Sequence, residues 1–173
     1  MRRTLRTTVA AVAVTASAAL GGGLLTAAPA AAAPLAEETA ASSQSSARSN
    51  LSVARGYMNL SHTQFAGLKK VKPFNWTNNG CSVPTGYAPY MKTFTTSCNQ
   101  HDFGYRNFGS AAKGLELDPT RTAKNWIDAR FKAEMRRACK TKYKKGNPLK
   151  LCNSAAAAYH FAVNNAGDKH FFG

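Results

Sequence analysis

Acidic residues are scarce in this chain: 8 of its 173 residues are Asp or Glu, against 23 Lys and Arg, and the formal net charge is +15. Any site that needs several carboxylates therefore has few candidates, and each internal Asp is informative. Long apolar runs are also missing beyond the N-terminus, where none approaches the roughly 20 residues of a membrane span. We therefore expect the mature protein to be soluble. Sustained alternation of apolar and polar residues is absent as well, which argues against a β-sheet protein.

What the chain does contain is enough for one folded domain. Its length suits a single domain, and hydrophobic residues make up 44% of it, which excludes a wholly disordered polar chain. We find no internal repeat. The following patterns divide the chain into a leader, a linker and a helical domain.

The N-terminus has the layout of a secretory signal. Three Arg in the first six residues are followed by an apolar stretch over residues 9–25 and by Ala-x-Ala cleavage sites within residues 27–33. We expect residues 1–33 to be a signal peptide and the mature protein to be extracellular. The Arg2–Arg3 pair leaves a twin-arginine route open beside the general secretory route.

Because the protein is expected to be secreted, its four cysteines are expected to form disulfides. In an oxidising compartment, Cys81, Cys98, Cys139 and Cys152 most simply form two disulfides. Three pairings are possible, and we prefer the sequential one, because it closes two short loops. Each bridge would stabilise the fold by about 3 kcal/mol. A zinc site is the rival, but the short Cys-x-x-Cys spacing is missing.

In the first half of the mature chain, the composition and the positions of Pro, Gly and Asn indicate where helices and loops lie. Residues 34–49 are mostly Ala, Ser, Thr and Glu with little to pack, so we expect a flexible segment followed by a domain over residues 50–173. Residues 50–68 fit one or two short helices. Residues 69–90 are rich in Pro, Gly and Asn and predict a long ordered loop, a type that is usually functional. A helix is predicted over residues 94–108.

The second half of the domain is also predicted to be helical. Asp118-Pro119 has the signature of a helix start, and apolar residues then recur every four positions from Ile127 to Cys139. A Lys-rich loop is expected over residues 140–150 and a last helix over residues 151–165. The fold class is therefore all-α.

Two helices carry the candidate chemistry. His101 lies three residues after Cys98 and four before Tyr105, on the packed side of its helix, and Asp128 lies at the edge of an apolar stripe. A buried carboxylate needs a partner, and His101 is the best candidate. The Asp would fix the imidazole tautomer and leave the other ring nitrogen free as a base. Two simpler readings stay open: a packed core histidine, and an Asp paired with an Arg.

Asp102 follows the candidate base, about 100° further round the helix. The turn over residues 78–81 would be held near it by a Cys81–Cys98 disulfide. Carbonyl oxygens opposite a carboxylate are typical of a calcium site. The other histidines, His62, His160 and His170, have no visible partner, and both Asp168 and His170 lie in the C-terminal tail.

The string CNQHDFGYRN over residues 98–107, followed by Asp128, resembles the active-site helix of the secreted phospholipases A2. It is most similar to the bacterial and fungal branch. The likeness extends over about residues 74–172 and includes all four cysteines, Phe-Asn-Trp at 74–76 and Trp-Ile-Asp at 126–128. It implies a compact helical domain with two antiparallel disulfide-linked core helices and a metal-binding loop.

The resemblance also implies the residues' roles. His101 would deprotonate a water that attacks the sn-2 ester of a glycerophospholipid, while Asp128 orients the imidazole and stabilises its cationic form. Calcium would bind the substrate phosphate and the developing oxyanion. Asp102 matches the family's side-chain ligand, and the carbonyl of Gly80 matches its backbone ligand. Asn79 stands where the family has an acidic ligand.

An Asn in place of an acidic ligand predicts weaker calcium binding, because affinity depends on the number of charged ligands. Three outcomes follow from Asn79: an enzyme with weak calcium binding, a site completed by another acid such as Glu116 or Asp118, or a catalytically silent relative. The alternative to the enzyme is thus a non-catalytic cationic membrane-binding or antimicrobial protein that keeps the fold.

The positive charge predicts an anionic partner. Four lysines crowd one loop and are expected to face the membrane: Lys140, Lys142, Lys144 and Lys145. Each would contribute about 1 kcal/mol near an anionic surface. A solvated basic surface and a general polyanion binder are the competing interpretations. We expect a monomer that acts on phospholipid membranes or micelles and has no nucleic-acid partner, because no recognition motif is present.

Overall fold

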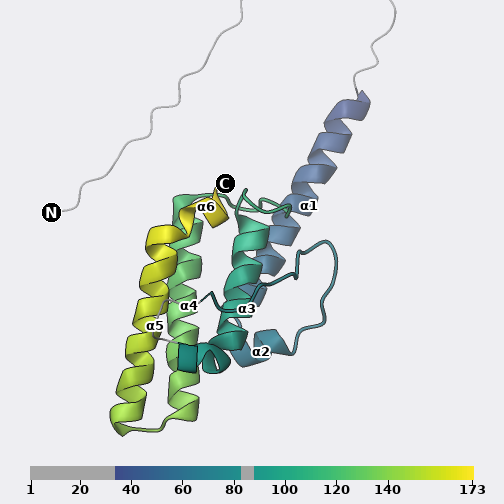
Figure 1. Cartoon of the computed structure of the whole chain (residues 1–173). Coiled ribbons are helices and arrows are strands. Elements are labelled where there is room, and N and C mark those ends of the chain that lie inside the picture. Colours follow the sequence, from purple (N-terminus) through teal and green to yellow (C-terminus); the bar gives the residue numbers. More distant parts are fainter. Residues whose placement is uncertain (1–33, 83–87) are drawn as a thin grey trace, which may run out of the picture. The chain divides into compact units, whose positions relative to one another are not determined.

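The computed structural model describes residues 34–82 and 88–173, so the expected signal peptide at 1–33 lies outside the described residues. The described part is helical and contains no strand, as the sequence predicted (Figure 1). Its elements are α1 Pro34–Asn59, α2 His62–Ala66, the 3-10 turn η1 Ala88–Tyr90, α3 Met91–Phe108, α4 Arg121–Lys142, α5 Gly146–Ala166 and α6 Asp168–Phe171. None of the helices in these ranges is long and apolar enough to cross a membrane.

The segment of residues 34–49, which was expected to be flexible, forms the first part of α1 and is helical. Its composition explains the difference, because Ala, Glu, Gln and Arg are good helix formers. Residues 42–49 are exposed, and α1 meets the core further along through Ala54 and Met58, which are buried. Their four-residue spacing places both side chains on one face of the helix.

The helices α3, α4 and α5 pack side by side and position the site (Figure 1). Residues on α4 at four-residue spacing, from Ile127 to Cys139, are buried as predicted. The three-residue turn over 143–145 reverses the chain between α4 and α5, and the Cys139–Cys152 disulfide joins these two helices. The resulting core contains Phe94, Phe131, Met135 and Tyr159, among others.

Two helix starts differ from the predictions. The N-cap of α4 is Thr120 rather than Asp118, since the Thr120 hydroxyl accepts a hydrogen bond from the backbone N–H of Ala123 at 3.2 Å. α5 begins at Gly146, so most of the loop expected over 140–150 is helical. Pro148 lies in the first turn of α5, where a missing backbone N–H costs no helical hydrogen bond.

A buried polar cluster fixes the corner between α1 and α2. Glu134 Oε2 accepts a hydrogen bond from the backbone N–H of His62 at 2.9 Å and lies 3.1 Å from its Nδ1. Arg130 bonds to Glu134 Oε1 at 3.0 Å and also donates to carbonyls at the end of α1, as does Gln100. The cluster therefore satisfies carbonyl groups that a helix end leaves unpaired.

Candidate active site

A histidine of α3 and an aspartate of α4 meet inside the domain. His101 Nε2 lies 2.8 Å from Asp128 Oδ1, and both side chains are buried. Burial by itself would raise the pKa of Asp128, but the hydrogen bond and charge of His101, with bonds from Lys124 and Tyr105, hold this pKa below its usual range. The carboxylate is therefore ionised at neutral pH.

Two further side chains hold the Asp128 carboxylate, and neither contact was predicted from the sequence. The Tyr105 hydroxyl donates to Asp128 Oδ1 at 2.8 Å, and Lys124 Nζ donates to Oδ2 at 2.8 Å. Burial and the neighbouring Asp128 raise the pKa of Tyr105, so the hydroxyl remains a donor. Lys124 is fully buried and also donates to the carbonyl of Val163 at 3.2 Å. The four-residue spacing of Lys124 and Asp128 on one helix was the available signal.

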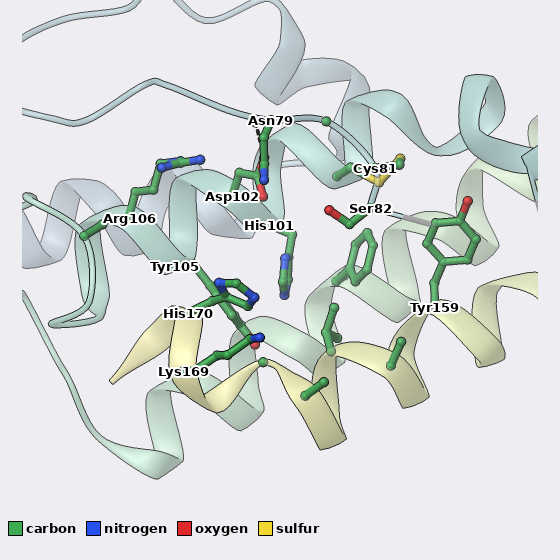
Figure 2. A pocket seen from close by; sticks show the side chains of 18 residues that line it. Asn79, Cys81, Ser82, His101, Asp102, Tyr105, Arg106, Tyr159, Lys169 and His170 are labelled. Atoms are coloured by element: carbon green, nitrogen blue, oxygen red, sulfur yellow. Dashed lines mark hydrogen bonds between the residues drawn. A yellow bond between two sulfur atoms is a disulfide. The ribbon is translucent and has the colours of Figure 1, made fainter. Parts of the chain in front are cut away.

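A pocket of about 460 Å³ opens beside the histidine (Figure 2). Its lining combines residues 79–82, one face of α3, Phe131 of α4, the C-terminal half of α5 and part of α6. His101 lines this pocket, whereas Asp128 lies behind it. The wall along α4 and α5 is mainly apolar and includes Phe131, Tyr159, Ala162 and Val163. Such a cavity, with a few polar groups at one point, is typical of a small-molecule site.

The predicted metal-binding residues come together at the pocket rim. The backbone N–H of Asn79 donates to Asp102 Oδ2 at 3.0 Å, and Asn79, Gly80 and Asp102 all line the pocket. The Cys81–Cys98 disulfide ties this loop to α3. Gly80 has φ 72°, a left-handed conformation that favours glycine.

The Asp102 carboxylate is partly withdrawn from solvent at the rim. Burial raises the pKa of Asp102, and hydrogen bonding by the Asn79 backbone together with the charges of His101 and Arg106 offsets this only in part. Carboxylate, amide and carbonyl oxygens are ligands that calcium accepts, so the residues present fit this ion by donor type. Within the described ranges, however, no group of three His, Cys, Asp or Glu side chains could hold a metal.

The two acids considered as replacements do not reach this rim. Asp118 pairs with Arg55 at 2.8 Å and bonds to Thr120, and neither Asp118 nor Glu116 lines the pocket. Among the lining residues that the structure describes, Asp102 is the one carboxylate. The expected calcium site therefore has a single acidic side chain.

The four lysines expected to face the membrane are exposed around the end of α4 and the turn into α5. None of them lines the pocket, and Lys142 donates to the hydroxyl of Thr93 at 3.0 Å. The cationic side chains at the pocket itself are Arg106 and Lys169, with His170 beside them. His170 was not predicted at the site, because its position near the C-terminus gave no sign that it lies at the pocket beside α3.

The comparisons with known proteins identify the class of molecule to which this fold and site belong. A family model described as prokaryotic phospholipase A2 matches residues 56–167, well over half of the chain, including the histidine–aspartate pair and all four cysteines. The chain belongs to the prokaryotic phospholipase A2 family and is thus a phospholipase A2 enzyme. No curated protein matches it significantly.

Proposed function

We propose that this protein is a secreted, calcium-dependent phospholipase A2 that hydrolyses the sn-2 ester of glycerophospholipids with a water activated by His101. The observation that carries the proposal is the 2.8 Å contact between His101 Nε2 and the buried Asp128, made by a histidine that also lines a large pocket. An imidazole held in this way has one nitrogen engaged and one available to the substrate.

The hydrogen bonds around Asp128 support a separate role for each side chain of the site. Because ionised Asp128 accepts from Nε2–H, we assign the free lone pair to His101 Nδ1, which takes the proton from the attacking water. The negative charge of Asp128 then stabilises the imidazolium. Tyr105 and Lys124 are positioning residues, since each fixes one oxygen of Asp128 and leaves the carboxylate little freedom to rotate. No side-chain nucleophile and no acyl-enzyme are required.

Asp102, the carbonyl of Gly80 and the side chain of Asn79 are the residues that would hold calcium. The bound ion would supply positive charge to the substrate phosphate and to the oxyanion that develops at the ester. The single carboxylate supports weak binding, because each acidic ligand adds to calcium affinity.

The surroundings of the site support a lipid surface as the partner. The apolar wall along α4 and α5 suits an acyl chain, and the exposed lysines from Lys140 to Lys145 suit an anionic membrane. The proposed reaction needs no residue from a second subunit, and we propose that the protein acts as a monomer. Most aromatic rings of the described residues pack in the core, which is consistent with a lipid rather than a nucleic acid as the proposed partner, and two disulfides suit an extracellular protein.

The test is fatty-acid release from mixed-chain phospholipid vesicles, with calcium or with a chelator. We expect calcium-dependent release of the sn-2 chain alone, lost in His101→Ala. Release that is equal with chelator would overturn calcium dependence. Vesicle leakage without any hydrolysis would instead support the cationic membrane-binding protein as the function.

A further inference from the structure

The two sides of the pocket differ in charge. In Figure 2, Arg106, Lys169 and His170 lie to one side of His101, while Cys81 and Tyr159 lie to the other. The first side is cationic and the second is largely apolar. A phospholipid has the same division, with a polar headgroup at one end and acyl chains at the other.

The fold holds the cationic side in place. Arg106 lies one turn after Asp102 on α3, so its charge is next to the proposed metal ligand. Lys169 and His170 belong to α6, which is fastened to the end of α3. The backbone N–H groups of residues 110 and 111 donate to the carbonyl of Phe171 at 2.8 and 3.2 Å. This anchoring keeps the exposed side chains of α6 over the pocket rim.

The charge at this rim is not neutralised within the pocket lining. Asp102 is the single carboxylate among the described lining residues, against the two permanent charges of Arg106 and Lys169. Neither Arg106 nor Lys169 has an ion pair in the described part of the chain. The charge of Asp102 would also be offset by a bound calcium ion. The site thus presents net positive charge where a headgroup would lie.

We infer that Arg106 and Lys169 form a headgroup subsite that makes the enzyme prefer phospholipids with anionic headgroups, such as phosphatidylglycerol, over zwitterionic phosphatidylcholine. This rests on the proposed function. A choline cation would be repelled by the two side chains, whereas a headgroup without that cation leaves the lipid with a net negative charge that they attract. Lys169 lies beyond the matched residues 56–167, so the family match does not assign it a role.

This preference is distinct from adsorption to a charged membrane. The exposed lysines around the α4–α5 turn lie outside the pocket and can draw the protein to any anionic surface, whichever lipid enters the site. Short-chain lipids below their critical micellar concentration are monomeric, so no charged membrane or micelle is present to which the protein could adsorb. Selectivity measured with such monomers reports on the pocket alone.

The experiment compares kcat/KM for short-chain phosphatidylglycerol and phosphatidylcholine, both monomeric, in saturating calcium. The full mature chain is used, with Lys169→Gln, Lys169→Glu and the control Lys92→Gln. Lys92 is an exposed lysine of α3 that does not line the pocket, so its replacement removes the same charge elsewhere. We expect the wild-type ratio of kcat/KM to favour phosphatidylglycerol.

The variants should change this ratio in proportion to the local charge. Lys169→Gln should lower it about threefold and Lys169→Glu about tenfold, the range of one and two charge steps at a partly exposed site. Lys92→Gln should leave it unchanged. Hydrolysis of both lipids with no preference, or an equal shift in Lys92→Gln, would overturn the subsite and leave the proposed function standing. A wild-type protein that hydrolyses neither lipid would overturn both.

Discussion

The described part of the domain contains two buried histidine–carboxylate pairs with similar distances, one made through Nε2 of His101 and the other through Nδ1 of His62, and the His101 pair opens on the pocket. His101 and Asp128 are 2.8 Å apart, and His62 and Glu134 are 3.1 Å apart. The histidines are 6% and 5% exposed, and each carboxylate is 1% exposed. Each carboxylate also has a basic partner four residues away on α4, Lys124 or Arg130. Distance and burial therefore do not distinguish a catalytic pair from a structural one.

The two pairs differ in whether a substrate can reach the histidine. His101 lines the pocket, next to the loop that carries Asn79 and Gly80. The His62 pair instead connects α2 to α4, and its acid also accepts a backbone N–H, a bond that serves the fold. A buried pair of this kind becomes a candidate for catalysis when a substrate can reach the histidine's second nitrogen.

Replacing the histidines should give the largest contrast. His101→Gln should lower kcat/KM by about 10³-fold, because it removes the general base, whose contribution is typically 10²–10⁴-fold. His62→Gln should leave kcat/KM nearly unchanged and lower the free energy of unfolding by about 1–3 kcal/mol, since it disturbs a buried hydrogen bond. Initial rates and denaturant unfolding measure both effects. Similar losses of activity in the two folded variants would remove the distinction between the pairs.

Replacing the acids should separate catalysis from stability. Asp128→Asn leaves the fully buried Lys124 without its counter-charge, so we expect a loss of about 3–5 kcal/mol in unfolding free energy. Its kcat should fall about 10²-fold, because the imidazole loses its orienting charge. Glu134→Gln should cost less stability, since Arg130 is partly exposed, and should preserve kcat. A drop in kcat for Glu134→Gln, in protein shown to be folded, would count against the assignment.

Adding a negative charge to the proposed metal-binding loop should have a moderate effect on calcium affinity. Asn79→Asp adds a second carboxylate at the rim beside Asp102 and should tighten calcium binding about tenfold, as one charge at short range in a partly solvated site would do. Asn78→Asp is the matched control, because Asn78 is exposed and does not line the active-site pocket. Calorimetry and the calcium dependence of kcat measure the change. An unaltered calcium requirement in Asn79→Asp would contradict this placement of the metal.

Lowering the pH should have the smallest effect, which is the loss of the stability that ionised Asp128 contributes to the fold. The pKa of Asp128 is lowered in the folded state from its ordinary 3.8, so its ionised form stabilises the fold above that value. This stabilisation is lost as the pH falls through the lowered folded pKa. The stability difference between wild type and Asp128→Asn should therefore shrink as the pH falls below about 4. A difference that keeps growing below about pH 4 would contradict the ionised carboxylate.

The parts of the site that the sequence predicted are those set by local periodicity. His101 and Asp128 each occupy a defined face of a regular helix, and the disulfide places residues 79–81 near Asp102. Contacts between distant segments were not predictable in this way. His62 and Glu134 are 72 residues apart, and nothing in the weak pattern around His62 indicates that α2 reaches α4.

The remaining differences also have physical causes. Lys124 was missed because a basic residue on a Lys-rich helix reads as solvated surface, although here it is fully buried against Asp128. Asp168 and His170 were set aside as tail residues. In the structure Asp168 pairs with Arg121 and lies 3.5 Å from Lys124, which helps fasten α6 beside the site. A terminal segment acquires a role only through such tertiary contacts.

Histidine alkylation, mapped by peptide mass spectrometry while activity is followed, tests the central claim most directly. A small alkylating reagent that enters the pocket should modify His101, and the loss of fatty-acid release should follow this modification in proportion, while His62 stays unmodified. Saturating short-chain lipid should slow both the modification of His101 and the loss of activity. Full activity in protein alkylated at His101, or inactivation that follows His62 instead, would contradict the assignment of catalysis to the pair at the pocket.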